Sequence, residues 1–209
     1  MRVVAGPDGS KTFLEAEFDR HADVLSALAA RARRPAAPPD ICTFLLRSPA
    51  SAPARALVAM KDNLAKAGIQ ARLILAMLEP ERDLGQLFDI LRGLAPEADG
   101  GSLIRWARNP RLWDAHEQVT YGLDTCWSGD PMRRDADKRN ALALFETAPD
   151  TAFHAACAFK ALWSISVPVP THLLEIGASA KPGCACGQTA NSPVAAPKPL
   201  MEVWPLVRH

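Results

Sequence analysis

No hydrophobic run in this sequence is long enough to cross a bilayer. The longest, Leu73–Leu78, is far shorter than the roughly 20 apolar residues that a membrane-spanning helix needs. An excess of one charge is also missing: the formal net charge is +1, so nucleic acid and anionic lipid are not indicated as partners. The first residues lack the apolar core of a signal peptide. We therefore expect a cytoplasmic protein without a membrane span.

The five cysteines do not have the spacing of a metal site. Cys42, Cys126 and Cys157 each lie among apolar residues, which is typical of small buried side chains. Cys184 and Cys186 form a C-x-C pair, but no second pair stands at the spacing of a zinc site. We expect neither a bound metal nor a cofactor.

A complete phosphate-binding loop is missing too, although "VVAGPDGSKTFL" (3–14) begins like one. That loop needs glycine, four residues and then Gly-Lys-Ser/Thr, so that its backbone amides surround a phosphate. Here the stretch from Gly6 to Lys11 is one residue short, and Ser10 replaces the second glycine. A turn whose Ser10 or Thr12 caps a helix is the favoured interpretation. A small nucleotide-binding enzyme that uses Lys11 is the weaker alternative.

Short apolar runs alternate with helical patterns through the middle of the chain. The runs 41–48, 69–78 and 102–107 are typical of buried strands, and 53–68 and 83–94 carry apolar residues at helical spacing. The order β-α-β-α-β with short connections predicts parallel strands covered by helices. The expected fold class is α/β, with a mostly parallel or mixed sheet flanked by helices.

Three regions are expected along the chain. Residues 1–39 hold an N-terminal helix, over 10–34, and a proline-rich linker, both packed on the core. Residues 40–165 form the α/β domain. Residues 166–209 form a proline-rich C-terminal tail that is partly disordered.

The pattern changes after the third strand. Segments 117–122 and 124–129 are β-prone and one residue apart, which predicts a hairpin or a bent pair. Residues 140–146 fit a strand as well as a helix, whereas 150–163 predict a helix. The inward side of that helix is expected to carry Phe153, Ala156, Cys157 and Trp163.

From Asp40 to Trp163 this order of elements resembles one half of the phospholipase D superfamily. The family carries His-x-Lys, an aspartate-glycine turn and Gly-Ser-x-Asn on the next strand, and later a helix that ends near a tryptophan. The matching text here is "AHEQVTYGLDTCWSGDPMRRD" (115–135), followed by "KRNALALFETAPDTAFHAACAFKALW" (138–163). The resemblance implies a single phospholipase D-like half.

Three positions decide what the resemblance implies for catalysis. His116 matches the histidine that attacks phosphorus in the family, but Gln118 stands where the family has lysine. Asp130 stands where Gly-Ser-x-Asn supplies neutral donors, and a carboxylate there would repel a phosphate. Loss of one stabilising donor costs roughly 100- to 1000-fold in rate. The catalytic positions His116, Gln118 and Asp130 therefore imply a degenerate domain with little or no catalysis.

Binding is the expected role of such a domain, with a small anionic ligand or another protein as the partner. Arg133 and Arg134 are the candidate cations, and Tyr121 and Trp127 are candidate rings for stacking, although aromatic clusters also form cores. Active members of the family pair two motifs and this chain holds one, so a homodimer is expected. The alternative is a divergent phosphodiesterase in which His116 still attacks. A purely structural, hydrogen-bonded His116 also fits.

Overall fold

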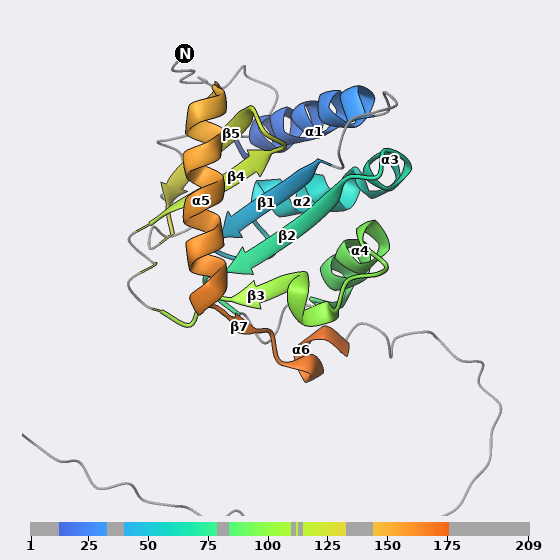
Figure 1. The fold of residues 1–209 in the computed structure, drawn as a ribbon, viewed down its shortest axis with the longest axis vertical. Helices are drawn as coiled ribbons and strands as arrows, with labels where there is room; N and C mark the ends of the chain where they lie inside the picture. Colours follow the sequence, from blue (N-terminus) through green and yellow to red (C-terminus); the bar gives the residue numbers. More distant parts are fainter. Residues whose placement is uncertain are drawn as a thin grey trace, which may run out of the picture.

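The computed structural model describes residues 13–32, 40–78, 84–109, 112, 115–132 and 144–175. Its helices are α1 (Phe13–Ala32), α2 (Ala52–Ala59), α3 (Lys61–Lys66), α4 (Gly85–Leu94), η1 (Gly100–Ser102, a 3-10 turn), α5 (Pro149–Ile165) and α6 (Thr171–Glu175). Its strands are β1 (Ile41–Leu46), β2 (Gln70–Leu75), β3 (Ile104–Trp106), β4 (His116–Tyr121), β5 (Thr125–Pro131), β6 (Leu144–Thr147) and β7 (Val167–Pro168). Figure 1 shows their arrangement.

The seven described strands form one sheet in the order β6-β5-β4-β1-β2-β3-β7. β1, β2 and β3 run parallel, with Leu73 opposite both Phe44 and Ile104. β4 lies antiparallel to β1 and is followed outward by β5 and β6, while β7 pairs antiparallel with β3 at the other edge. The predicted α/β class, a mostly parallel or mixed sheet flanked by helices, is confirmed in its mixed form.

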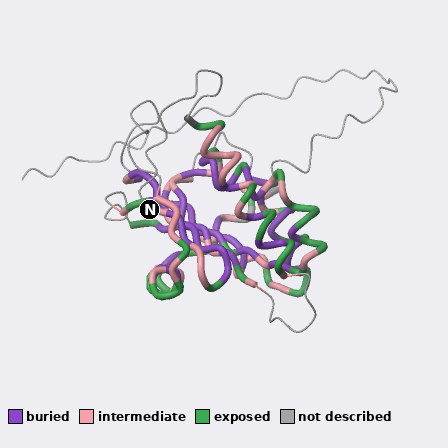
Figure 2. Tube along the Cα trace, turned by 90° about the horizontal axis from the view of Figure 1, so that it is seen from above, coloured by how far each residue is buried: buried purple, intermediate pink, exposed green. Residues whose placement is uncertain are grey.

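The larger core lies between the sheet and the helices α1 to α4. Side chains alternate along a strand, so Cys42, Phe44 and Leu46 of β1 all point to this face, and all three are fully buried. Each helix adds at least one fully buried leucine to the same cluster: Leu25, Leu57, Leu64 and Leu91. Figure 2 shows the buried segments gathered in the middle and the exposed ones on the outer turns of the helices.

The helix α5 crosses the opposite face of the sheet, in front of the strands in Figure 1. It buries Ala152, Ala155 and Phe159. The predicted inward side was therefore wrong for two residues, because Phe153 is 65% exposed and Cys157 is exposed. Ala156 and Trp163 are half-buried. The two alanines allow the helix to approach the strands closely, which turns Phe153 and Cys157 toward solvent.

The structure also settles several boundaries. The ambiguous segment 140–146 overlaps β6, and the helix expected over 53–68 is divided at Met60 into α2 and α3. Within the expected tail, Val167–Pro168 form β7 and Thr171–Glu175 form α6. The three-region division and the cytoplasmic location stay predictions. In the described part of the chain, no helix combines the length and apolarity that a membrane span requires.

Candidate functional site

The carboxyl ends of β1, β2 and β3 meet at one edge of the sheet, and β4 begins beside them. The chain leaves β1 toward β2 on one side, whereas β4 lies on the other side of β1. Open α/β sheets place their ligands at the carboxyl ends of the strands, where the order reverses in this way. His116 is the first residue of β4, so the fold places it at that edge.

The ring of His116 is exposed and oriented by the backbone of the neighbouring strand. Its Nδ1 lies 2.7 Å from the carbonyl oxygen of Gly129 in β5. A carbonyl oxygen only accepts hydrogen bonds, so Nδ1 carries the proton and donates it. In the neutral ring the lone pair is then on Nε2. That nitrogen is the one a nucleophile or general base would use.

An irregularity in β5 brings the Gly129 carbonyl to this histidine. His116 pairs with Pro131 and Gln118 pairs with Ser128, so two steps along β4 correspond to three along β5. Such a bulge re-aims the side chains next to it. Gly129 has no side chain, and a Cβ there would collide with the indole of Trp127. Glycine is therefore required where the histidine finds its acceptor.

Glu117, which follows His116, is only 5% exposed and points toward the core face of the sheet. Its Oε1 accepts a hydrogen bond from the backbone N–H of Arg47 at 2.8 Å and one from the Ser51 hydroxyl at 2.5 Å. Arg47 directly follows β1, and Ser51 directly precedes α2. Donors between a strand and the start of a helix commonly hold anionic ligands. In this chain they bind a carboxylate of the protein itself.

Gln118 is half-buried inside the sheet, opposite Leu45 of β1 and Ser128 of β5. One step further along the strands, the hydroxyls of Thr43 and Thr120 are hydrogen-bonded at 2.5 Å. All four of these neighbours are uncharged.

Asp130 is 6% exposed and precedes Pro131, the pairing partner of His116. The edge therefore carries two buried carboxyl groups close to the histidine, Glu117 and Asp130. Arg133 and Arg134 lie outside the described residues, as Lys11 does, so their roles stay predictions.

Tyr121 and Trp127 lie in the core, each 1% exposed, under the helix α1. The Tyr121 hydroxyl is hydrogen-bonded to Nδ1 of His21, whose ring stacks edge-on against Trp127 with centroids 4.7 Å apart. Burial lowers the pKa of His21 to about 3 and raises the pKa of Tyr121. The expectation that these two rings stack on a ligand is corrected, because a ligand cannot reach rings so deeply buried.

A cavity of about 240 Å³ opens at the carboxyl ends of β2 and β3. Its lining is mostly apolar and includes Met77, Trp106 and Asn109. The guanidinium of Arg108 lies 5.7 Å from the ring centroid of Trp106, close enough for a cation–π contact. Trp106 borders this cavity, whereas Trp127, the tryptophan named in the sequence analysis, is buried in the core.

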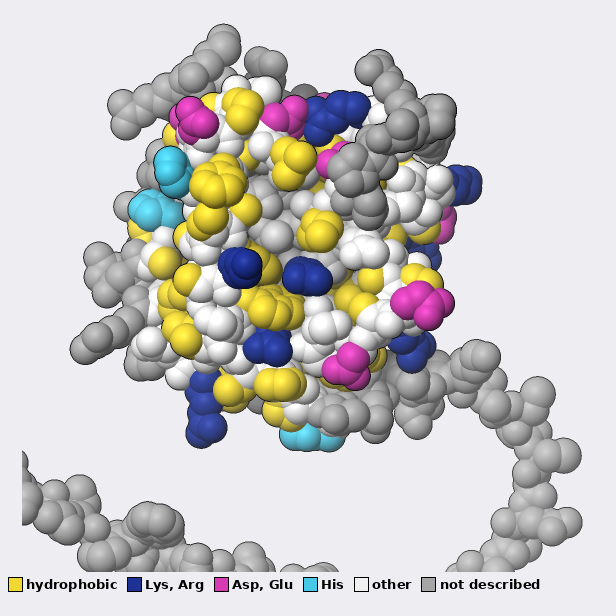
Figure 3. All heavy atoms as spheres, viewed as in Figure 1, with side chains coloured by type: hydrophobic (Ala, Val, Ile, Leu, Met, Phe, Trp, Pro, Cys, Tyr) yellow, Lys and Arg dark blue, Asp and Glu magenta, His cyan; other side chains and the backbone are white. Residues whose placement is uncertain are grey.

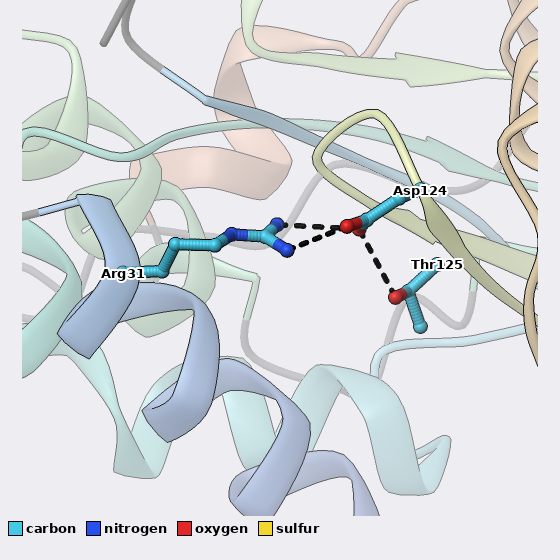
Figure 4. A network of polar contacts seen from close by, with 3 residues as sticks. All are labelled: Arg31, Asp124 and Thr125. Carbon is cyan, nitrogen blue, oxygen red and sulfur yellow. Dashed lines mark hydrogen bonds and ion pairs between the residues drawn. The ribbon is translucent and has the colours of Figure 1, made fainter. Parts of the chain in front are cut away.

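Asp124, the carboxylate closest in sequence to the family's aspartate-glycine turn, lies at the far end of the hairpin from His116. Arg31 of α1 donates to both of its carboxylate oxygens, at 2.6 and 3.2 Å, and Thr125 donates to it at 3.1 Å (Figure 4). The hydrogen bond from Arg31 lowers the pKa of Asp124. This carboxylate joins α1 to the β4–β5 turn and does not reach the candidate site.

Glu117 is the residue of this site that the sequence analysis did not single out. A signal was present, because Glu117 alternates with Val119 and Tyr121 on the core-facing side of β4. A charged residue at such a position needs buried donors. For metals, the described residues contain no group of three or more His, Cys, Asp or Glu side chains that could hold an ion.

The fold is similar to that of a solved chain described as a phospholipase D family member, Nuc from Salmonella typhimurium. The match covers 70% of this chain and 88% of that chain, at 14% sequence identity and a TM-score of 0.43. No family model and no curated protein matches the chain. This is the family that the sequence resembles.

Proposed function

We propose that this chain is a degenerate phospholipase D-like domain with a binding role and little or no catalysis. Its binding site is the edge where β1, β2 and β3 end beside His116. The observation that supports this most directly is the position of Glu117, which accepts the Arg47 N–H and the Ser51 hydroxyl. The donors between the end of β1 and the start of α2 are thus already used by a side chain of the protein itself.

Charge at the edge supports the same conclusion. Phosphoryl transfer is accelerated mainly by cations and donors that stabilise developing negative charge. The position two residues after His116 holds the neutral Gln118, and Asp130 adds a second buried carboxyl group. The cation that the resemblance calls for two residues after His116 is therefore missing at that position.

The proposed ligand is small and anionic, with a planar apolar part, and lies at the ends of β2 and β3 rather than beside Glu117 and Asp130. The planar part fits the cavity beside Trp106, and the exposed Arg108 supplies a positive charge at its rim. A protein partner at the same edge is the other form of this role. The homodimer expected from the resemblance, paired through the face that holds His116, remains part of this proposal.

A divergent phosphodiesterase is the second candidate, and one observation favours it. The hydrogen bond from His116 Nδ1 to the Gly129 carbonyl leaves the lone pair on Nε2 in an exposed ring. A nucleophilic histidine needs that arrangement. In this alternative Gln118 orients the phosphate, and Arg133 or Arg134 supplies the charge.

Hydrolysis of bis(4-nitrophenyl) phosphate separates the two candidates. We compare the wild type with His116→Ala and Gln118→Lys, after checking by thermal unfolding that all three are folded. The binding role predicts no turnover above background in any of them. Turnover by the wild type that disappears in His116→Ala would establish the phosphodiesterase and overturn the proposal.

A further inference from the structure

The face of the sheet that α5 crosses is only partly covered by that helix. Leu45 of β1 and Ile74 of β2 lie beneath α5 and pack with its Phe159. Two residues before Ile74, Arg72 is exposed on the same face. Ile41, at the start of β1, is 38% exposed and also points to this face. Parallel strands are usually covered on both faces, but the described part of the chain leaves the first halves of β1 and β2 without a covering helix.

Three cationic side chains gather at this open area around one indole ring. The guanidinium groups of Arg72 and Arg105 lie 5.9 and 4.9 Å from the ring centroid of Trp163, in the last turn of α5. Lys160 is exposed and stands three residues before Trp163, so the two are neighbours on the helix surface. Figure 3 shows dark-blue side chains grouped with hydrophobic ones in the middle of this face and acidic side chains at its margins. We call Arg72, Arg105, Lys160 and Trp163 the basic surface.

The indole and one guanidinium of the basic surface are held in fixed positions. Nη1 of Arg105 donates to the carbonyl oxygens of Trp163 and Ser166, at 2.9 and 3.2 Å, and its Nε donates to the Gly101 carbonyl at 3.3 Å. A cation at the carboxyl end of a helix is favourable, so Arg105 also stabilises α5. The Trp163 ring packs on Phe159, with centroids 5.5 Å apart. Groups that are fixed before a partner binds lower the entropy cost of binding.

The other two cations are not neutralised within the described chain. The side chains of Arg72 and Lys160 are exposed, and neither is paired with a carboxylate of the described residues. The acidic residue of α5, Asp150, lies in its first turn, at the other end of the helix from Trp163. Cations grouped around one ring repel each other, and an anion between them offsets this repulsion. The basic surface is therefore complementary to a partner with clustered negative charge.

We propose that the basic surface binds an acidic segment of another protein, which lies across the first halves of β1 and β2 with its carboxylates on Arg72 and Lys160. Arginine binds a carboxylate through two parallel hydrogen bonds. Arginine and tryptophan are also the side chains most enriched where protein interfaces derive their binding energy. The exposed Ile41 supplies an apolar contact at the border of the same area.

Charge argues against two other occupants. Nucleic acid is bound through many phosphate contacts, whereas this surface has three cations and the net charge of the chain is only +1. The C-terminal residues 176–209 of the chain itself carry Lys181, Lys198 and Arg208 against a single acidic residue, Glu202. That segment has the same sign of charge as the basic surface.

The basic surface is separate from the edge that holds His116. Gln118, Leu45 and Ile74 lie in one row across β4, β1 and β2. His116 lies two residues from this row toward the carboxyl ends of the parallel strands, whereas Arg72 lies two residues from it toward their amino ends. Binding at the basic surface does not depend on the ligand or the activity proposed for the edge.

Fluorescence polarisation with a fluorescein-labelled octaglutamate peptide tests the charge complementarity. We compare the full-length wild type with Arg72→Gln and Lys160→Gln, and each change should raise the dissociation constant about threefold to fivefold. Lys66→Gln is the matched control, because it removes an exposed positive charge from α3, on the other side of the sheet, and should leave the dissociation constant unchanged. Absence of binding by the wild type overturns the proposal, as does an equal loss of affinity in all three variants.

An oligothymidylate with the same number of negative charges tests the other class of polyanion. At equal ionic strength, the wild type should bind it more weakly than the octaglutamate peptide. Tighter binding of the oligonucleotide would overturn the assignment of this surface to a protein partner.

The indole N–H signal of Trp163 in NMR spectra, assigned through Trp163→Phe, locates the bound peptide. It should shift when octaglutamate is added, whereas the signal of Trp127, which is 1% exposed, should not. A shift of the Trp106 signal without a shift of the Trp163 signal would place the peptide at the cavity beside the strand ends and overturn the proposal.

Discussion

The β4–β5 hairpin has a closed end, at the turn, and an open end, where β4 begins at His116 and β5 ends at Pro131. At the closed end the stabilising contacts come from α1. At the open end they come from the hairpin backbone and from the start of α2. The turn is made by Gly122, whose φ of 68° suits glycine, and it is held from outside by Arg31 through Asp124. Just before the turn, the Tyr121 hydroxyl bonds to His21 of the same helix. This end is fastened to the body of the protein by side chains.

The open end has the opposite construction. Its register shifts by one residue, and the Gly129 carbonyl turns to accept from His116. Glu117 reaches away from the hairpin to the start of α2. One hairpin therefore has a closed end that secures it and an irregular end that presents side chains. The difference shows how a single supersecondary unit can carry both stability and a site.

Substitution of Gly129 disrupts the open end and should lower the free energy of unfolding more than the other changes described here. In Gly129→Ala the new methyl group collides with Trp127, which is 1% exposed and has no space to move. Overpacking of this kind costs up to about 3 kcal/mol, and we expect a loss near that value in urea unfolding. Gly93→Ala is the control, because a Cβ there meets nothing within 4 Å and alanine favours the helix α4. Equal losses in the two variants would contradict this account of the bulge.

The pH dependence of the free energy of unfolding tests the contribution of His21 to the closed end. The pKa of His21 is lowered to about 3 by burial, so the folded chain does not bind a proton there until the pH is far below 6.5. The unfolded chain binds that proton near pH 6.5, so stability falls as the pH falls below that value. Between pH 7 and pH 5 the loss from this group is about 2 kcal/mol. Urea unfolding at both pH values measures it.

A histidine NMR titration of the folded protein provides the check on that mechanism. The His21 ring should stay neutral at pH 5. If His21 is found protonated at pH 5 in the folded chain, the acid sensitivity has another origin.

Removal of the ion pair at the turn should lower the free energy of unfolding the least. Arg31 and Asp124 keep 45% and 33% of their side chains exposed, so solvent screens their attraction. We expect Arg31→Ala and Asp124→Asn each to cost less than about 1 kcal/mol. A double-mutant cycle in urea, repeated in high salt, measures the coupling between the two side chains. A coupling above 2 kcal/mol would show that this end depends on the pair more than its exposure allows.

The sheet was predictable because its signals are local. The apolar runs and their order gave β1, β2 and β3, and the short gap at Gly122 gave the hairpin. The orientation of α5 was not predictable in the same way, since Ala152, Cys157 and Phe153 are all compatible with burial. Which of them faces the sheet depends on how closely the helix can approach, and that is a property of the packed structure.

The candidate site was also predictable only where its signals are local. His116 could be found from a motif, but its hydrogen bond to Gly129 depends on a one-residue register shift that no local pattern encodes. The binding of Glu117 by Arg47 and Ser51 joins residues about 70 positions apart in the sequence. Tyr121 and Trp127 were assigned to a ligand because they are near His116 in the sequence. The strand carries them away from the edge and into the core.

One edge of the sheet has a consequence for aggregation. It ends in β7, a strand of two residues, one of which is Pro168. Proline has no amide hydrogen, and so short a strand offers almost no row of free donors and acceptors to an incoming chain. Strand-by-strand growth of the kind that leads to fibrils is therefore blocked at this edge.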